Sequence, residues 1–127
     1  MLGKEIKFVD DCMGEKAEKA AQDLKPGEIL LLENVRYYAE ETSGDADFAE
    51  KLSRLGDIYV NDAFGAAHRA HASTTVVAKF FEGKKCFGKL MEAELKSIDR
   101  VLNDSKRPVT AIIGGAKVCC KITIIED

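Results

Sequence analysis

The chain has 127 residues, of which 46% are apolar, and a formal net charge of −3. This length allows a real core, and this apolar fraction excludes a wholly disordered chain. No apolar run approaches the roughly 18 residues of a membrane span, and a mildly acidic chain gives no reason to expect nucleic acid. The four cysteines form no C-x-x-C pair, and no secretory signal is visible at Met1, so we expect reduced thiols and a cytoplasmic protein.

The first third of the chain alternates strand and helix signals. Residues 5–9 are apolar and extended in character, and residues 15–24 are rich in helix formers with alanines on one face. Pro26 and Gly27 then stop the helix. Residues 28–32 form a nearly continuous apolar run, which predicts a strand covered on both faces.

A polar stretch at residues 40–44 predicts a loop. It is followed by a helix at residues 45–55, where Asp45 is the expected N-cap and apolar residues recur at helical spacing. Residues 58–60 are β-branched or aromatic and predict a short buried strand.

After that strand, small residues at 63–67 predict a loop in which the backbone can come close to a ligand. Ser73 is the expected N-cap of a helix at residues 74–81, and residues 82–85 predict a turn. This loop would follow the carboxyl end of its strand, where ligands bind in open α/β sheets.

The last part of the chain begins with a long amphipathic helix at residues 88–102, where Met91 belongs to the apolar stripe and is expected to serve packing. Residues 109–113 predict a fourth strand, and residues 118–127 have helical character. Strands that alternate with helices of this length predict a parallel sheet of βα units. Four strands are few for such a domain, so we expect an incomplete one whose unpaired edges favour self-association.

The first candidate for chemistry is Arg36, at the carboxyl end of the strand at residues 28–32. A guanidinium there can grip a carboxylate or phosphate with two hydrogen bonds. The alternative is a structural salt bridge to Glu33 or to an acid of the following loop. Spacing alone does not decide between the two.

The second candidate is the basic loop that holds His68, Arg69 and His71. A local positive cluster on an acidic chain points to a small anionic partner, and solvated surface charge is the alternative. A metal site is not indicated, because no Asp, Glu or Cys nearby completes the histidine pair. A hydrolytic triad with Asp62 is not indicated either, because the chain lacks a G-x-S-x-G nucleophile elbow.

The third candidate is the segment GGAKVCCK at residues 114–121. Two glycines at a helix start expose backbone N–H groups, which favour phosphate. Lys117 and Lys121 lie four residues apart and would point the same way on a helix. The alternative is a solvated helix face with Cys119 and Cys120 as small packing residues, because the segment is not a P-loop.

Together these segments resemble the phosphoglycerate kinase family. The matching stretches, in order, are FVDDCMG, LLLENVRYYAEE, YVNDAFGAAHRAHAST, GKLMEAELKSIDRVLND and TAIIGGAKVCCKI. The resemblance implies two Rossmann-like three-layer α/β domains joined by a hinge, of which this chain holds incomplete parts. Residues 1–86 would belong to the N-terminal domain, 87–105 would form the interdomain helix, and 106–127 would begin the C-terminal domain with its first strand.

The resemblance also implies a phosphotransferase of glycolysis, which moves a phosphoryl group reversibly between 1,3-bisphosphoglycerate and ADP to give 3-phosphoglycerate and ATP. Arg36 and Arg69 would bind the phosphoglycerate. Lys117 and Lys121 would be catalytic, and with Gly115 and Ala116 they would bind the ADP or ATP and its Mg²⁺. Cys120 stands where the family often has an acid that can hold Mg²⁺, so we assign no metal ligand there. The family is monomeric.

The chain also departs from the family pattern. Nothing in it matches the R-x-D-x-N and H-x-G-R motifs, which supply further phosphoglycerate ligands and a catalytic arginine, or the glycine-rich nucleotide loop. We therefore expect the 127 residues alone to be inactive. The alternative functions are a non-catalytic anion-binding fragment or split-gene module, and an unrelated flavodoxin-like nucleotide binder.

Overall fold

The structure, a computed structural model, describes residues 3–104, 106–110 and 112. The chain divides into two compact units, Met1–Leu95 and Lys96–Asp127, with the boundary inside helix α4 (Lys89–Asn103). The domain boundaries expected from the sequence stay a prediction. The predicted helix at residues 118–127 and the segment GGAKVCCK lie outside the described residues.

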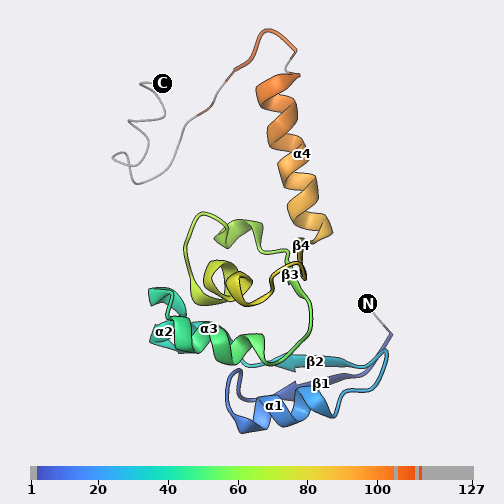
Figure 1. Cartoon of the computed structure of the whole chain (residues 1–127). Helices are drawn as coiled ribbons and strands as arrows, with labels where there is room; N and C mark the ends of the chain where they lie inside the picture. Colours follow the sequence, from blue (N-terminus) through green and yellow to red (C-terminus); the bar gives the residue numbers. More distant parts are fainter. Residues whose placement is uncertain (1–2, 105, 111, 113–127) are drawn as a thin grey trace. The chain divides into compact units, whose positions relative to one another are not determined.

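A βαβ unit opens the first compact unit, as the alternation of signals predicted. Strands β1 (Ile6–Val9) and β2 (Ile29–Leu32) pair in parallel, and α1 (Glu15–Gln22) connects them (Figure 1). Parallel strands need such a crossover, because a tight hairpin can only join antiparallel ones. The parallel α/β class expected from the sequence is confirmed.

The prediction that β2 is covered on both faces is wrong for the described residues. Phe8 and Leu31 are register partners and lie on the same face of the pair, and they are 57% and 56% exposed. Side chains alternate between the two faces of a strand, so only the face that carries Val9 and Leu32 can turn toward the core. An apolar run indicates that both faces of a strand favour burial, but it does not show that another segment packs on each face.

A second parallel pair joins β3 (Tyr59–Asn61) to β4 (Lys85–Phe87) (Figure 1). The prediction of a turn at residues 82–85 is therefore wrong at its end, since Lys85 already belongs to β4. A three-residue strand offers too few positions for a periodic signal. Within the described residues the four strands form two separate pairs, and residues 109, 110 and 112 of the predicted strand 109–113 are not in a strand.

Two short helices follow β2 and its one-turn extension η1 (Val35–Tyr37). Helix α2 (Ala39–Ser43) stands where the sequence predicted a polar loop, and that prediction is wrong. Gly44 ends α2 in the left-handed region, at φ +72°, where a Cβ would also come within 2.6 Å of the Ala70 carbonyl oxygen. Helix α3 (Ala46–Ser53) starts as predicted, because the Asp45 side chain accepts a hydrogen bond from the Phe48 N–H at 2.8 Å.

The helix expected at residues 74–81 is replaced by two turns, the first wound more loosely than an α-helix and the second more tightly. After η2 (Phe64–Ala66), a π-helical turn η3 (Ala72–Val76) leads into the 3₁₀ turn η4 (Val77–Phe80). Ser73 is not the N-cap: it lies inside η3, and its hydroxyl donates to Glu41 at 2.7 Å. The hydroxyl thus satisfies a buried carboxylate from another segment instead of its own helix end.

A buried apolar cluster joins the loop after β1 to α3, η3 and η4. Cys12 is fully buried in it, and burial raises the pKa of the Cys12 thiol to about 11, so this thiol stays protonated near neutral pH and acts as a packing group. Tyr38 packs on Phe48 with ring centroids 5.4 Å apart. The members of the cluster are Cys12, Phe48, Ala49, Ala72, Val77 and Phe81.

The start of α4 is fixed by the residues that end β3. The Asp62 carboxylate accepts a hydrogen bond from the Met91 N–H at 2.9 Å, and the Gly88 N–H donates to the Asn61 carbonyl oxygen at 2.9 Å. Asp62 therefore satisfies one of the amide groups that a helix leaves unpaired at its first turn. Met91 is buried, which confirms its packing role. No helix in the described ranges is long and apolar enough to cross a membrane.

Asp11 organises the turn between β1 and α1. Its carboxylate accepts hydrogen bonds from the N–H groups of Cys12 at 2.7 Å, Met13 at 3.2 Å and Gly14 at 2.9 Å, and from the Tyr38 hydroxyl at 3.2 Å. Burial alone would raise the pKa of Asp11, but these donors outweigh it and hold the pKa below its ordinary value.

We predict that Asp11→Ala lowers the free energy of unfolding by about 1–3 kcal/mol at neutral pH, because it leaves several donors without their acceptor. The folded pKa of Asp11 lies below the unfolded value of about 3.9, so its contribution is present above that pH and is lost as the pH falls through the folded pKa. Urea unfolding should show that the difference in the free energy of unfolding between wild type and variant becomes smaller as the pH falls. Asp57→Ala, at an exposed position, is the control. A difference in the free energy of unfolding that is equally large in acid and at neutral pH would contradict this role of the Asp11 carboxylate.

Candidate functional site

One cavity of about 270 Å³ gathers the basic residues that the sequence singled out. It is lined by Arg36, Thr42, Gly65, Ala66, His68, Arg69 and His71. Arg36 and Arg69 come from different segments of the chain, so the fold places on one cavity wall two residues that sequence spacing could only treat separately. The other predicted site residues, Gly115, Ala116, Lys117 and Lys121, lie outside the described residues.

Arg36 is held at the carboxyl end of β2 by the turn η1. The Asn34 side chain accepts a hydrogen bond from the Arg36 N–H at 3.0 Å and caps this turn. The Arg36 side chain then reaches Glu41, and its Nη1 donates to Glu41 Oε1 at 2.7 Å. The sequence offered Glu33 or an acid of the following loop as a salt-bridge partner, and the structure shows the second, Glu41, which lies in α2. The ion pair does not withdraw Arg36 from the cavity, because its side chain remains 35% exposed.

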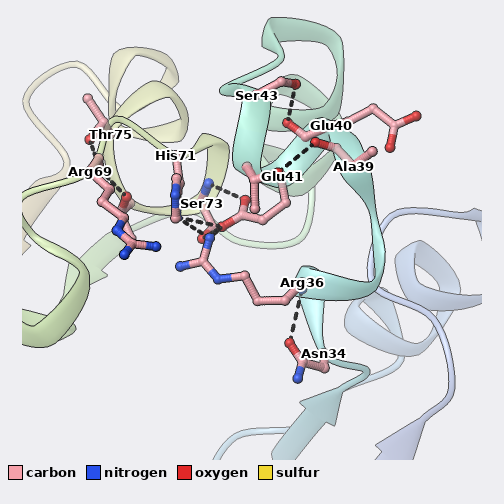
Figure 2. A network of polar contacts seen from close by, with 12 residues as sticks. Asn34, Arg36, Ala39, Glu40, Glu41, Ser43, Arg69, His71, Ser73 and Thr75 are labelled. Atoms are coloured by element: carbon pink, nitrogen blue, oxygen red, sulfur yellow. Dashed lines mark hydrogen bonds and ion pairs between the residues drawn. The ribbon is translucent and has the colours of Figure 1, made fainter. Parts of the chain in front are cut away.

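Arg69 is held by its backbone in the loop after η2. Its N–H donates to the Ala66 carbonyl at 3.1 Å, and its own carbonyl accepts from the Thr74 hydroxyl at 3.2 Å. The same carbonyl accepts from the Thr75 hydroxyl at 3.4 Å (Figure 2). Its Nε donates to His68 Nε2 at 3.1 Å, so this nitrogen of the His68 ring acts as the acceptor.

His71 lies at the start of η3 and is only 8% exposed. Its Nδ1 contacts Arg36 Nη1 and lies 3.9 Å from Glu41 Oε1 (Figure 2). A guanidinium can only donate, so Nδ1 is the acceptor and the ring hydrogen is on Nε2. The ring is therefore fixed by the same guanidinium nitrogen that binds Glu41.

Glu41 is the functional residue that sequence reasoning did not single out, since it was covered only as an acid of the predicted loop at residues 40–44. Its side chain has no exposed surface, and both of its carboxylate oxygens are bound. Oε2 accepts from the Ser73 N–H at 2.8 Å, and Oε1 accepts from the Ser73 hydroxyl at 2.7 Å and from Arg36 (Figure 2). Nothing in the local pattern separates Glu41 from its exposed neighbour Glu40. The distinction depends on which way α2 faces, and that follows from tertiary packing.

The charges of this cavity suit a small anion. Two guanidinium groups line it, and the residues that line it include no carboxylate. Guanidinium groups present planar pairs of donors that match carboxylate and phosphate. Among the described residues no group of three or more His, Cys, Asp or Glu is placed to hold a metal ion. The arrangement can bind and orient an anion through hydrogen bonds.

A larger hollow of about 650 Å³ has a different character. It lies along β3, β4 and α4, and apolar side chains such as Phe64, Phe87 and Met91 dominate its lining. Size alone would make it the first site to consider. It lacks the pair of cations that the smaller cavity has, so the smaller cavity is the better candidate for anion chemistry.

Comparisons with known proteins point to one family. The family model described as phosphoglycerate kinase matches residues 1–127. The chain is 51% identical to a phosphoglycerate kinase of Ruegeria pomeroyi over 122 residues, which cover 96% of this chain and 30% of that protein. It is 55% identical to a chloroplastic phosphoglycerate kinase of Volvox carteri over 126 residues, or 99% of this chain and 27% of that protein.

Solved structures give the same result. The crystal structure of phosphoglycerate kinase from Pyrococcus horikoshii aligns with a TM-score of 0.83 and 32% identity, and the alignment covers 95% of this chain and 31% of that one. The fold is thus that of a segment of such an enzyme, in agreement with an incomplete Rossmann-like α/β domain. The chain spans less than a third of the length of these relatives.

Proposed function

The chain belongs to the phosphoglycerate kinase family, and on that premise we propose that it supplies the phosphoglycerate-binding part of a glycolytic kinase. The reaction is reversible phosphoryl transfer between 1,3-bisphosphoglycerate and ADP, which gives 3-phosphoglycerate and ATP. The observation that carries the proposal is the presence of Arg36 and Arg69 on the wall of one cavity. A phosphoglycerate bears a phosphate and a carboxyl group, and both are matched by guanidinium donors.

The residues of this cavity bind and orient the acid substrate. Phosphoryl transfer needs little covalent chemistry from the protein, which positions the two substrates and stabilises negative charge. Arg36 enters this task with one nitrogen already bound to Glu41, and Arg69 with its backbone held by Ala66. Both cations are thus supported before a ligand arrives, which lowers the cost of ordering them.

The nucleotide side of the reaction is assigned to residues outside those the structure describes. We propose that Lys117 and Lys121 contact the phosphates and the transferring group, together with Gly115 and Ala116. Mg²⁺ enters with the ADP or ATP, whose phosphate charge it neutralises when bound. We place the protein in the cytoplasm, although some of the similar proteins are named as chloroplastic. The interdomain role of residues 87–105 belongs to the same proposal.

We predict that the chain binds 3-phosphoglycerate with roughly millimolar affinity, and that Arg36→Ala and Arg69→Ala each weaken binding by about tenfold or more. Each change removes charge-assisted hydrogen bonds worth about 1.5–3 kcal/mol. Chemical-shift titration of the labelled chain measures the affinity. The control is Arg54→Ala, because Arg54 is paired with Glu50 at 2.9 Å and does not line the cavity. Equal affinities for wild type and both cavity variants would contradict the assignment.

We also predict that a polypeptide of these 127 residues alone shows no turnover of ATP with 3-phosphoglycerate. Turnover requires two substrates brought in line, and the sequence has no match to the family motif that supplies the catalytic arginine. A coupled phosphoryl-transfer assay on protein of confirmed intact mass tests this. Steady turnover that disappears in Arg69→Ala would overturn it. Binding without turnover would favour the non-catalytic anion-binding module when the chain acts by itself.

A further inference from the structure

We propose that Glu41 is a positioning residue of the anion site: it holds one nitrogen of the Arg36 guanidinium, so that the remaining nitrogens are presented to the ligand. This inference rests on the proposed function, because it assigns Arg36 to the bound phosphoglycerate. It adds a residue that does not line the cavity. Glu41 therefore acts through Arg36.

The first support is the complete use of the Glu41 carboxylate. The side chain has no exposed surface, and an ionised carboxylate in such a place is stable only when it is paired and hydrogen-bonded. Ser73 provides two donors, at 2.8 Å and 2.7 Å, and Arg36 provides the countercharge at 2.7 Å. The two Ser73 bonds tie the carboxylate to η3, so Arg36 is anchored to a fixed group.

The second support is the geometry of the Arg36 guanidinium. Its contacts with Glu41 and with His71 are both made by Nη1. No hydrogen bond to another described residue occupies Nε or Nη2, and Arg36 lines the cavity with Arg69 and His68. Figure 2 shows the second terminal nitrogen of Arg36 directed away from Glu41. An edge of two donors is thus left for a ligand, and this is the arrangement that grips a carboxylate or phosphate.

The third support is that one anchor fixes two groups of the cavity wall. Arg36 Nη1 also holds the His71 ring through its Nδ1, which leaves the ring hydrogen on Nε2. Arg36 and Glu41 come from the neighbouring segments η1 and α2, and His71, at the start of η3, lies 35 residues from Arg36 in the sequence. Without the carboxylate, Arg36 would lose this contact. The ligand would then have to order the guanidinium as it binds, and this cost would lower the affinity.

Two effects of the carboxylate on anion binding have opposite signs, and this makes the proposal testable. Glu41 opposes anion binding through its negative charge, and it favours binding by orienting the guanidinium. If charge dominated, removal of the carboxylate would tighten binding. We expect orientation to dominate, because a bidentate grip needs both donors aligned and Arg36 is a long, rotatable side chain.

The experiment is a titration of the full chain with 3-phosphoglycerate. We expect Glu41→Gln to weaken binding by about fivefold or more and Ser73→Ala, which removes only the hydroxyl donor to the carboxylate, by about twofold. Glu40→Gln, at the exposed neighbouring position on α2, is the matched control and should bind like wild type. Unchanged or tighter binding by Glu41→Gln would overturn the proposal.

A double-mutant comparison separates positioning from general damage. In an Arg36→Ala background, Glu41→Gln should cause no further loss of affinity, because the residue through which it acts is gone. A further loss of the same size there would show a structural role and contradict the proposal. Thermal unfolding of each variant identifies those that fold, and Ser73→Ala decides the matter if Glu41→Gln does not.

A measurement without ligand distinguishes this inference from the proposed function. Nitrogen-15 relaxation at Arg36 Nε should show an ordered guanidinium in wild type and Glu40→Gln, and a mobile one in Glu41→Gln. If wild type does not bind 3-phosphoglycerate, the proposed function is wrong. The relaxation measurement still tests whether Glu41 orders the Arg36 guanidinium. Equal mobility of Arg36 in wild type and Glu41→Gln would contradict the anchoring role of Glu41.

Discussion

The arrangement of the cavity depends on the pairing of one buried carboxylate, that of Glu41. A charge with no exposed surface must find its partners inside the protein, and Glu41 finds them in Arg36 and Ser73. Satisfying this charge requires α2, the turn η1 and the turn η3 to meet in one arrangement. The fold and the candidate site therefore share a single constraint, because the contact that stabilises the buried acid also fixes the cation that faces the cavity.

The same constraint supports the choice of the smaller of the two hollows described above as the candidate site. The large hollow beside β3, β4 and α4 is bounded mainly by apolar side chains, and it offers no pair of cations to orient a charged ligand. The cavity beside Arg36 is smaller, but two of its residues are already fixed, Arg36 by Glu41 and Arg69 by hydrogen bonds to its backbone. Side chains that are already held in place lose less conformational entropy when an anion binds, so their order adds to the affinity that their charge provides.

The sequence was informative where the signal is local. The Asp45 cap, the long helix that begins near residue 88 and the βαβ unit follow from capping and periodicity, and all are confirmed. It was uninformative where a tertiary partner decides. Ser73 is of a residue type that often caps helices, but its hydroxyl donates to Glu41 instead. The three-residue strand β4 is defined by its pairing with β3. The sequence selected Arg36 and Arg69, but it could not show that they share a cavity or that Glu41 supports one of them.

The most direct test of this account is a structure of the full chain with 3-phosphoglycerate bound. The account predicts the ligand in the cavity between Arg36 and Arg69, held by Nε and Nη2 of Arg36, while Nη1 keeps its bond to Glu41 Oε1. A ligand bound elsewhere, such as along the apolar hollow, would contradict the site. A ligand in the cavity with Arg36 released from Glu41 would contradict the anchoring role that connects the fold to the site.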